Sequence, residues 1–219
     1  MFVSSFVCVA LVAVGAVDAE APTFPSWGGA PEYQVGVNLT AHDVVKTGVT
    51  WPFLYFYSST VGNAKGTLGV NVSRYDHAQG QRDEVCDAIK KGSDAPCTTI
   101  HAIDGYMYVD IEGECCKCGN KIKPVRSDWL QDGGAKYVGK ATVRGLLADE
   151  YLKYGASDNH YYSLAGGNNP VRFMEHKNGM LKQWDFDLPS FRAGPIAGAK
   201  ELFSAPNNCG NTCHSIMCL

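Results

Sequence analysis

Three cysteines within four positions, in the stretch ECCKCGN at residues 114–120, constrain this chain more than any other feature. The sequence holds nine cysteines, of which Cys8 lies in an apolar leader. The remaining eight are Cys86, Cys97, Cys115, Cys116, Cys118, Cys209, Cys213 and Cys218. Whether they form disulfides, hold a metal or do redox chemistry depends on the compartment that the chain enters.

The first residues, 1–19, predict that compartment. They read MFVSSFVCVALVAVGAVDA and are apolar from about Phe6 to Val17, with no charge before Asp18. That length is typical of a signal peptide, whereas a membrane-spanning helix needs about 20 apolar residues. We therefore predict a signal peptide at 1–19 and a secreted, extracellular protein that does not span the membrane. The sequons at Asn38 and Asn71 are then predicted glycosylation sites.

An even number of cysteines in an oxidising compartment favours four disulfides and no metal. Zinc sites usually repeat a C-x2-C spacing, and the cluster at 115–118 has only Cys209-x3-Cys213-His214 as an irregular counterpart. Neighbouring cysteines cannot easily bond each other, so at least two members of the cluster need distant partners. We expect the cluster to attach the C-terminal tail to the domain. Cys86 and Cys97 flank the turn-rich segment KKGSDAP and are the expected local pair.

The rest of the chain is predicted to be mainly antiparallel β structure. Residues 20–32 are rich in Pro and Gly and predict an irregular lead-in, 33–208 a single β domain, and 209–219 a Cys-rich tail. Short β-prone segments are separated by turn signals, as in WPFLYFYSST at 51–60 and in RDEVCDAIKK, which follows the polar turn HAQGQ. Short helices at 39–45 or 198–203 are compatible with the sequence, but neither shows several helical turns of periodicity.

The pair Asn178-Gly179 predicts a hairpin with a two-residue loop. This loop places Phe173 opposite Trp184 and Arg172 opposite Asp185. The register gives one aromatic pair and two opposite-charge pairs, whereas a slip by one residue destroys both charge pairs.

The pair Asp104-Gly105 predicts a second two-residue loop, which places Ile100 opposite Val109 and His101 opposite Tyr108. One face of this strand pair is apolar and the other aromatic and amphipathic. We therefore expect the second face to be covered or to line a cavity.

No catalytic motif is present: G-x-S-x-G, H-E-x-x-H and phosphate-binding glycine loops are all absent. His160 opens the strand HYY and is expected to be satisfied by a hydrogen bond. Asp185 and Asp187 share a strand face that could take part in calcium binding, although a solvated face is the simpler interpretation. The net charge is −3 and the longest basic run is Lys90-Lys91, so nucleic-acid binding is not expected.

Aromatic side chains are abundant where catalytic groups are not. Such residues either pack as core or line a ligand pocket. The predicted pocket residues are Phe53, Tyr55, Tyr57, Tyr106, Tyr108, Tyr161, Phe173, Trp184 and Phe186.

An ordered series of stretches over residues 51–209 resembles a known group of proteins. The series is WPFLYFYSS, GVNVSRYDHAQGQRDEV, DWLQDGGAKYVGKATVRGLLADEY, HYYSLAGGNNPVRF and ELFSAPNNC. It is similar to secreted eukaryotic proteins that are distantly related to ependymin-related proteins and that also occur ahead of papain-like cysteine protease domains. Ala148 and Tyr151 depart from the group, which often has Cys and Trp there.

The resemblance implies a LolA-like fold, a large curved antiparallel sheet forming a half-barrel or stacked sheets around a hydrophobic pocket. It also implies lipid-like ligands, a possible role for calcium, and a disulfide from Cys209 to Cys115 or Cys116. We therefore predict a mainly β, disulfide-stapled protein that binds a hydrophobic or amphipathic small molecule without catalysis. The alternatives are a structural or adhesive module without a pocket and a hydrolase with an unrecognised site. The oligomeric state is left open.

Overall fold

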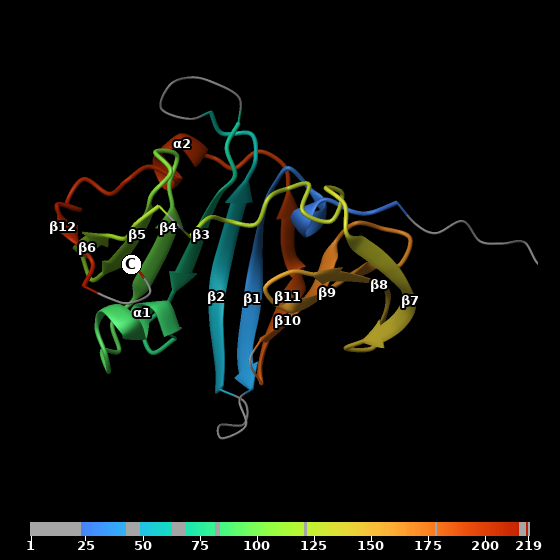
Figure 1. Ribbon diagram of the computed structural model, residues 1–219. Coiled ribbons are helices and arrows are strands. Elements are labelled where there is room, and N and C mark those ends of the chain that lie inside the picture. Colours follow the sequence, from blue (N-terminus) through green and yellow to red (C-terminus); the bar gives the residue numbers. More distant parts are fainter. Residues whose placement is uncertain are drawn as a thin grey trace, which may run out of the picture.

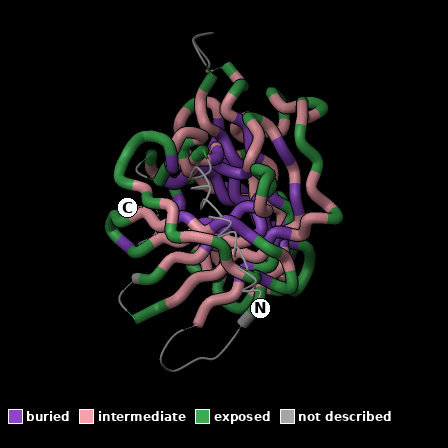
Figure 2. The backbone as a smooth tube through the Cα atoms, turned by 90° about the vertical axis from the view of Figure 1, so that its right-hand side faces the viewer, coloured by how far each residue is buried: buried purple, intermediate pink, exposed green. Residues whose placement is uncertain are grey.

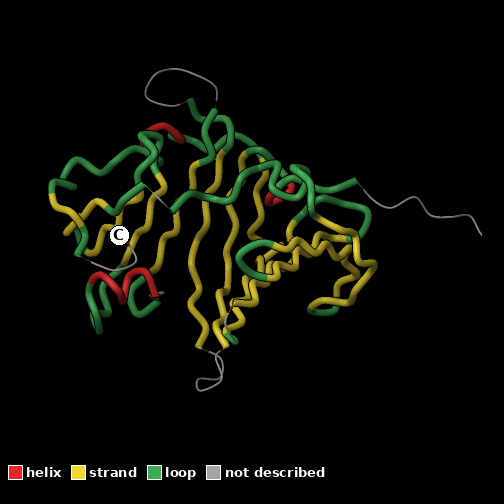
Figure 3. The backbone as a smooth tube through the Cα atoms, viewed as in Figure 1, coloured by secondary structure: helices red, strands yellow, loops and turns green. Residues whose placement is uncertain are grey.

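The computed structural model describes residues 23–42, 49–62, 69–81, 84–120, 122–177, 179–214 and 218. They form one twelve-stranded sheet with a few short helices (Figures 1 and 3). The strands are β1 (Glu32–His42), β2 (Val49–Ser58), β3 (Val72–His77), β4 (Cys97–His101), β5 (Met107–Ile111), β6 (Glu114–Lys117), β7 (Ala135–Val143), β8 (Leu146–Tyr154), β9 (Asp158–Leu164), β10 (Pro170–Lys177), β11 (Met180–Ala193) and β12 (Asn211–Thr212). The helices are η1 (Trp27–Gly29), α1 (Glu84–Ile89) and α2 (Ala199–Leu202).

The strand order is β12-β6-β5-β4-β3-β2-β1-β11-β10-β9-β8-β7, and only the β12–β6 pair is parallel. The sheet curves strongly, so that β8 and β9 lie at a steep angle to the long strands β1 and β2 (Figure 1). The prediction of a large curved antiparallel sheet is therefore confirmed. Among the described residues, no helix is long and apolar enough to cross a bilayer.

Alternation along β2 fixes which face of the sheet is buried. Phe53, Tyr55 and Tyr57 are 5%, 0% and 0% exposed, whereas Leu54 between them is 39% exposed. This period-2 pattern places the three aromatic rings on one face, which we call the inner face. The buried residues gather in the middle of the molecule, with the exposed ones around them (Figure 2).

The connection from β6 to β7 spans the sheet, because β6 is next to one end of the strand order and β7 is the other end. We call its residues 122–134 the strap. It passes in front of β2 and β1 in Figure 1. Leu130 is buried in the same cluster as the aromatic rings of β2, with Val125 and Trp129 packed against it.

The predicted β10–β11 register is confirmed. Phe173 pairs with Trp184 and Arg172 with Asp185. Arg172 Nε donates to Asp185 Oδ1 at 2.6 Å, so the predicted charge pair is an ion pair. The second predicted charge pair, Glu175 and Lys182, is also in register, but Lys182 forms its ion pair with Glu84.

The predicted β4–β5 register is wrong by one residue. Ile100 pairs with Tyr108 and His101 with Met107. The loop contains three residues, because the amide of Ala102 donates to the carbonyl of Tyr106 at 2.9 Å. Gly105, with φ of 86°, takes the left-handed position typical of a three-residue loop. The slip moves Tyr108 to the outer face, away from His101. Both faces are covered nevertheless, as expected from the sequence.

Three other segments differ from the predicted structure or were not predicted in detail. RDEVCDAIKK contains the helix α1 rather than another strand, and its Cys86 packs onto β4 and β5. Residues 39–42 continue β1 and are not helical, whereas 199–202 form the short helix α2. The lead-in contains η1, whose Trp27 is fully buried. The predicted signal peptide and the Asn178 half of the predicted turn lie outside the described residues.

All eight cysteines of the described residues form disulfides. Cys86 bonds Cys97 as expected, and Cys115, of the two candidates, bonds Cys209. Two further bonds follow in the same order along both segments, Cys116–Cys213 and Cys118–Cys218. The tail therefore runs alongside β6, where β12 pairs with it. The sulfur atoms of Cys118, Cys213 and Cys218 lie within 4.8 Å of one another, but as disulfides they offer no thiolate to a metal.

Candidate functional site

The structure brings seven of the nine predicted pocket aromatics together on the inner face. Six are buried there and Trp184 is partly buried against them. The seven are Phe53, Tyr55, Tyr57, Tyr161, Phe173, Trp184 and Phe186. Tyr106 and Tyr108 belong to a different cluster, with Ile100, at the end of the sheet near the tail.

Trp27 occupies the centre of this aromatic cluster and is 0% exposed. Its ring centroid lies 5.2 Å from that of Phe173 and 5.6 Å from that of Tyr161. Its indole nitrogen donates to the hydroxyl of Tyr55 at 3.3 Å. Burial raises the pKa of Tyr55 well above 10, so this phenol stays neutral. The cluster is therefore a packed aromatic core, and Trp27 from the N-terminal lead-in fills its centre.

Gly28 allows the indole of Trp27 to enter this core. Its φ is 68°, and a Cβ at this position would collide with the ring of Tyr33. Only glycine adopts that conformation and that close approach at low cost. The sequence gives no sign of this role beyond the Trp-Gly-Gly run within an otherwise irregular segment.

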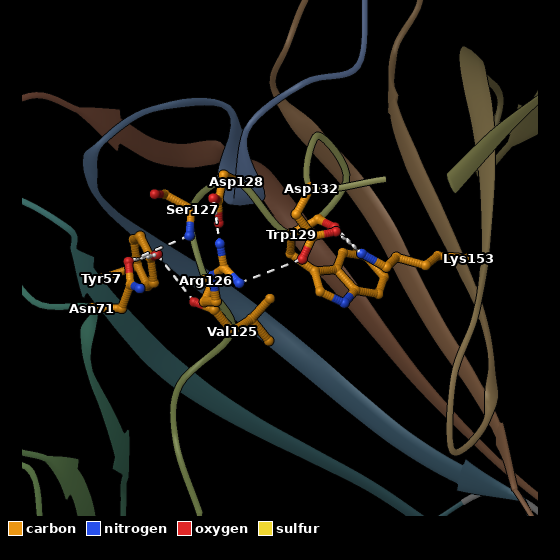
Figure 4. Close-up of polar contacts among 9 residues, drawn as sticks. All are labelled: Tyr57, Asn71, Val125, Arg126, Ser127, Asp128, Trp129, Asp132 and Lys153. Carbon is orange, nitrogen blue, oxygen red and sulfur yellow. Dashed lines mark hydrogen bonds and ion pairs between the residues drawn. The ribbon is translucent and has the colours of Figure 1, made fainter. Parts of the chain in front are cut away.

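The strap is tied to the sheet by a row of hydrogen bonds (Figure 4). The hydroxyl of Tyr57 lies 2.9 Å from Asn71 Oδ1 and 3.1 Å from the carbonyl oxygen of Val125. Asn71 Oδ1 also accepts from the amide of Ser127 at 3.3 Å. The carbonyl of Ser127 in turn accepts from the amide of Trp27 at 2.8 Å. The strap, the lead-in and the sheet therefore form one connected unit.

Charged side chains hold the other half of the strap. Arg126 pairs with Asp128 at 2.5 Å and lies 3.6 Å from Asp132. Lys153 on β8 donates to the carbonyl of Trp129 and to Asp132. Figure 4 shows these contacts following one another along the strap.

A cavity of about 450 Å³ lies beside the strap. Its wall comes from three segments: 69–71 before β3, the β4–β5 hairpin at 101–106, and 122–126 of the strap. Apolar groups include Val70, Ala102, Ile103, Ile122 and Pro124. A pocket of a few hundred Å³ with apolar walls and a few polar groups is typical of small-molecule sites. Of the predicted aromatics, only Tyr106 is part of this wall.

His101 is the buried polar residue of the cavity wall. It is 7% exposed, and its Nδ1 lies 2.9 Å from the hydroxyl of Ser73. Its Nε2 is buried and has no hydrogen-bond partner among the described residues. Burial, with a smaller contribution from Lys123, lowers the pKa of His101 from 6.5 to about 4. The imidazole is therefore neutral near pH 7 and keeps one hydrogen-bonding position unused.

Strand pairing connects His101 to the aromatic core. Tyr57 pairs with Ser73, Ser73 with His101, and His101 with Met107. Because cross-strand partners share a face, these side chains form one row on the inner face. The cavity and the aromatic core are therefore adjacent parts of one surface.

Several predicted sites lie away from this cavity. His160 Nδ1 is 2.7 Å from Glu150 Oε1, which confirms the expectation of a satisfied strand histidine. Asp185 is engaged on both oxygens, by Arg172 and by Gln183 Nε2 at 2.8 Å. Calcium binding there stays a prediction, as does glycosylation. Asn38 is exposed on β1, and Asn71 is partly buried at the cavity.

No family model matches the sequence, and no curated protein matches it. Among solved structures, the chain is similar to an uncharacterized conserved protein from Thermus thermophilus, with 11% identity, 84% of this chain and 90% of that one covered, and a TM-score of 0.48. It is also similar to LprF from Mycobacterium bovis, with 11% identity and a TM-score of 0.40; the match covers 82% of this chain and 90% of that one.

A third similar structure is a LolA superfamily protein from Nitrosomonas europaea, with 5% identity and a TM-score of 0.37; the match covers 80% of this chain and 91% of that one. These similarities extend over most of the chain but have TM-scores below 0.5. They concern the general path of the chain and say nothing by themselves about what this protein binds.

Proposed function

We propose that this chain is a secreted, non-catalytic binding protein for a hydrophobic or amphipathic small molecule. The observation that carries the proposal is the cavity of about 450 Å³ beside the strap. Its apolar walls would provide most of the binding free energy, at about 25 cal/mol for each Å² of apolar surface removed from water. Its few polar groups would orient the ligand.

In this proposal the predicted aromatics support the site more than they line it. Tyr106 contacts the ligand directly. Tyr57 holds Asn71, a residue of the cavity wall, through its hydroxyl. The other rings form a rigid packed core on the same inner face.

Secretion is part of the proposal. Four disulfides are typical of an oxidising compartment, and three of them close loops of 94 to 100 residues. Asn38 lies exposed on β1, where a glycan could extend into solvent. Expression in a secretory eukaryotic host, followed by N-terminal sequencing and glycosidase treatment, tests both points. An uncleaved leader retained in the cell would overturn this part.

Binding is tested on the oxidised, purified protein with 1-decanol and decanoate as probes. We expect saturable binding of one molecule, with amide chemical-shift changes at residues 69–71, 101–106 and 122–126. Native mass spectrometry of protein from its source should show a co-purified hydrophobic molecule. Shift changes confined to other regions, or no saturation with either probe, would contradict the proposal.

The second candidate is a structural or adhesive module without a ligand. It is favoured by the packing of the predicted pocket aromatics around Trp27, which is 0% exposed. This candidate predicts no saturable binding and a loss of stability from any truncation in the aromatic core. The same titrations therefore decide between the two.

A further inference from the structure

The cavity wall carries positive charge and no carboxylate. Its charged residues are Lys123 and Arg126 on the strap. Lys123 Nζ donates to the carbonyl of Gly105 at 2.6 Å, and it has no carboxylate partner within the part of the chain that the structure describes. An ammonium held by one carbonyl keeps its full charge and two further N–H donors.

The nearby acidic groups are already engaged. Asp104 in the hairpin accepts from the hydroxyl of Tyr108 at 2.6 Å and from the amide of Tyr106 at 3.1 Å. Asp128 pairs with Arg126, and Asp132 is shared between Arg126 and Lys153. Arg126 and Lys153 thus balance the two strap carboxylates, and neither carboxylate neutralises Lys123.

His101 adds no donor to this cavity. Its Nδ1 lies 2.9 Å from the hydroxyl of Ser73, and its Nε2 is buried out of reach of a ligand. The ammonium of Lys123 is therefore the group that the wall offers to an anionic oxygen.

Apolar surface lies beside this ammonium. Ile122 is 40% exposed at the cavity, although isoleucine is usually buried. Ile103 and Pro124 are partly exposed on the same wall. An apolar chain lying over them would remove this surface from water.

We propose that the cavity binds an amphiphile with one anionic head group, held by Lys123, with its apolar chain over Ile122, Ile103 and Pro124. This inference rests on the proposed function, because it specifies the ligand of the same site. It adds the sign of the head-group charge and the residue that recognises it.

The test uses three probes with the same decyl chain: decanoate, 1-decanol and decyltrimethylammonium, each below its critical micelle concentration. Isothermal titration calorimetry of the intact, disulfide-bonded protein should show decanoate binding about tenfold more tightly than 1-decanol. Decyltrimethylammonium should bind more weakly than either. Equal affinities for decanoate and 1-decanol would overturn the head-group inference while leaving the proposed function in place. No binding of any probe would overturn both.

Variants assign the effect to residues. Lys123→Gln should weaken decanoate binding about tenfold and change 1-decanol binding less than twofold, and Lys123→Arg should restore most of the loss. Lys136→Gln, at an exposed lysine on β7, is the matched control and should change neither. Ile122→Ser should weaken all three probes alike. If Lys123→Gln and Lys136→Gln behave identically, the assignment to Lys123 fails.

A final experiment distinguishes binding of a free amphiphile from binding to a membrane surface. Vesicles of phosphatidylglycerol present the same kind of anionic head group on a bilayer. We expect monomeric decanoate to bind and to compete with any vesicle binding. Two results together would overturn the cavity site in favour of a membrane-binding surface. The protein would sediment with the vesicles even in excess decanoate, and monomeric decanoate would not bind.

Discussion

The hydroxyl of Tyr57 lies 2.9 Å from Oδ1 of Asn71 and joins the aromatic core to the cavity wall. It also lies 3.1 Å from the carbonyl of Val125 in the strap. Tyr57→Phe removes this hydroxyl and leaves the partly buried Oδ1 of Asn71 with one partner fewer. We expect the free energy of unfolding to fall by about 1–3 kcal/mol, and the amide of Ser127 to exchange faster with solvent. Urea unfolding and hydrogen exchange measure both.

The control for that change is Tyr154→Phe on β8. Tyr154 is 57% exposed, so loss of its hydroxyl should change the stability by less than about 0.5 kcal/mol. Equal losses in the two variants would show that the contacts of Tyr57 do not hold the strap.

Phe173 distinguishes a packed core from a pocket. It is 9% exposed, and its ring centroid lies 5.2 Å from Trp27 and 5.8 Å from Trp129. Phe173→Ala should lower the free energy of unfolding by about 3–5 kcal/mol and leave decanoate affinity unchanged under conditions where the variant is folded. Phe56→Ala, at a partly buried ring on the outer face of β2, should cost less. A small loss of stability with altered binding at Phe173 would instead make the aromatic core the ligand site.

The buried imidazole of His101 makes stability depend on pH. Its pKa falls to about 4 in the folded protein, from 6.5, mainly because of burial. The unfolded chain therefore binds the extra proton first as pH falls below about 6.5. The stabilisation is fully present above that pH and is lost as pH falls toward about 4, by about 3 kcal/mol in total.

Urea unfolding between pH 7.5 and 4.5 measures this dependence. His101→Gln should flatten it, whereas His214→Gln, exposed in the tail, should keep it. The difference between the two variants removes the contribution of carboxylates that titrate in the same range. An unchanged slope in His101→Gln would refute the assignment.

The three tail disulfides should act redundantly. In the double variant Cys118→Ser/Cys218→Ser, the bond from Cys116 to Cys213 still holds the tail, so the lost bond closes only a short additional loop. The chain-entropy model gives a loss of about 2 kcal/mol for such a loop. Limited proteolysis should not release residues 209–213 from this variant. Release as fast as in fully reduced protein would contradict the redundancy.

The double variant matters, because a single change at Cys218 leaves a free thiol on Cys118. Its sulfur lies within 4.8 Å of that of Cys213, where it could attack the neighbouring disulfide. Peptide mapping without reduction should reveal such exchange in the single variant and none in the double variant.

The two hairpins show where sequence reasoning succeeds and where it fails. At β10–β11, alternating side chains and two charge pairs all require the same register, so the pairing was predictable. At β4–β5 one face is apolar and the other aromatic and amphipathic, and both faces are covered, so a slip by one residue exposes no large apolar side chain. There the register depends on loop length alone, and Asp104-Gly105 suits a three-residue loop, with Gly105 as its left-handed residue, as well as a two-residue one.

The candidate site was less predictable than the sheet. Phe53, Tyr55 and Tyr57 were predicted to line a pocket, but nothing in the sequence indicated what packs against them. Trp27 lies in a Pro- and Gly-rich segment without periodicity, so only tertiary structure places it among the rings. The cavity is built from turn and strap residues such as Asn71, Ile103 and Lys123, which come together through a connection that crosses the whole sheet. No local sequence pattern predicts that these residues come together.

The two ends of the strand order affect how this protein can associate. An open sheet leaves unpaired backbone groups at both edges, which can recruit strands from other chains. At one edge β12 spans only two residues, and disulfides on both sides of it fix its position. At the other, β7 carries exposed Lys136 and Lys140 and an irregularity in its pairing at Gly139. Short, charged and irregular edges discourage sheet extension, so we expect partners to contact the faces of the sheet rather than lengthen it.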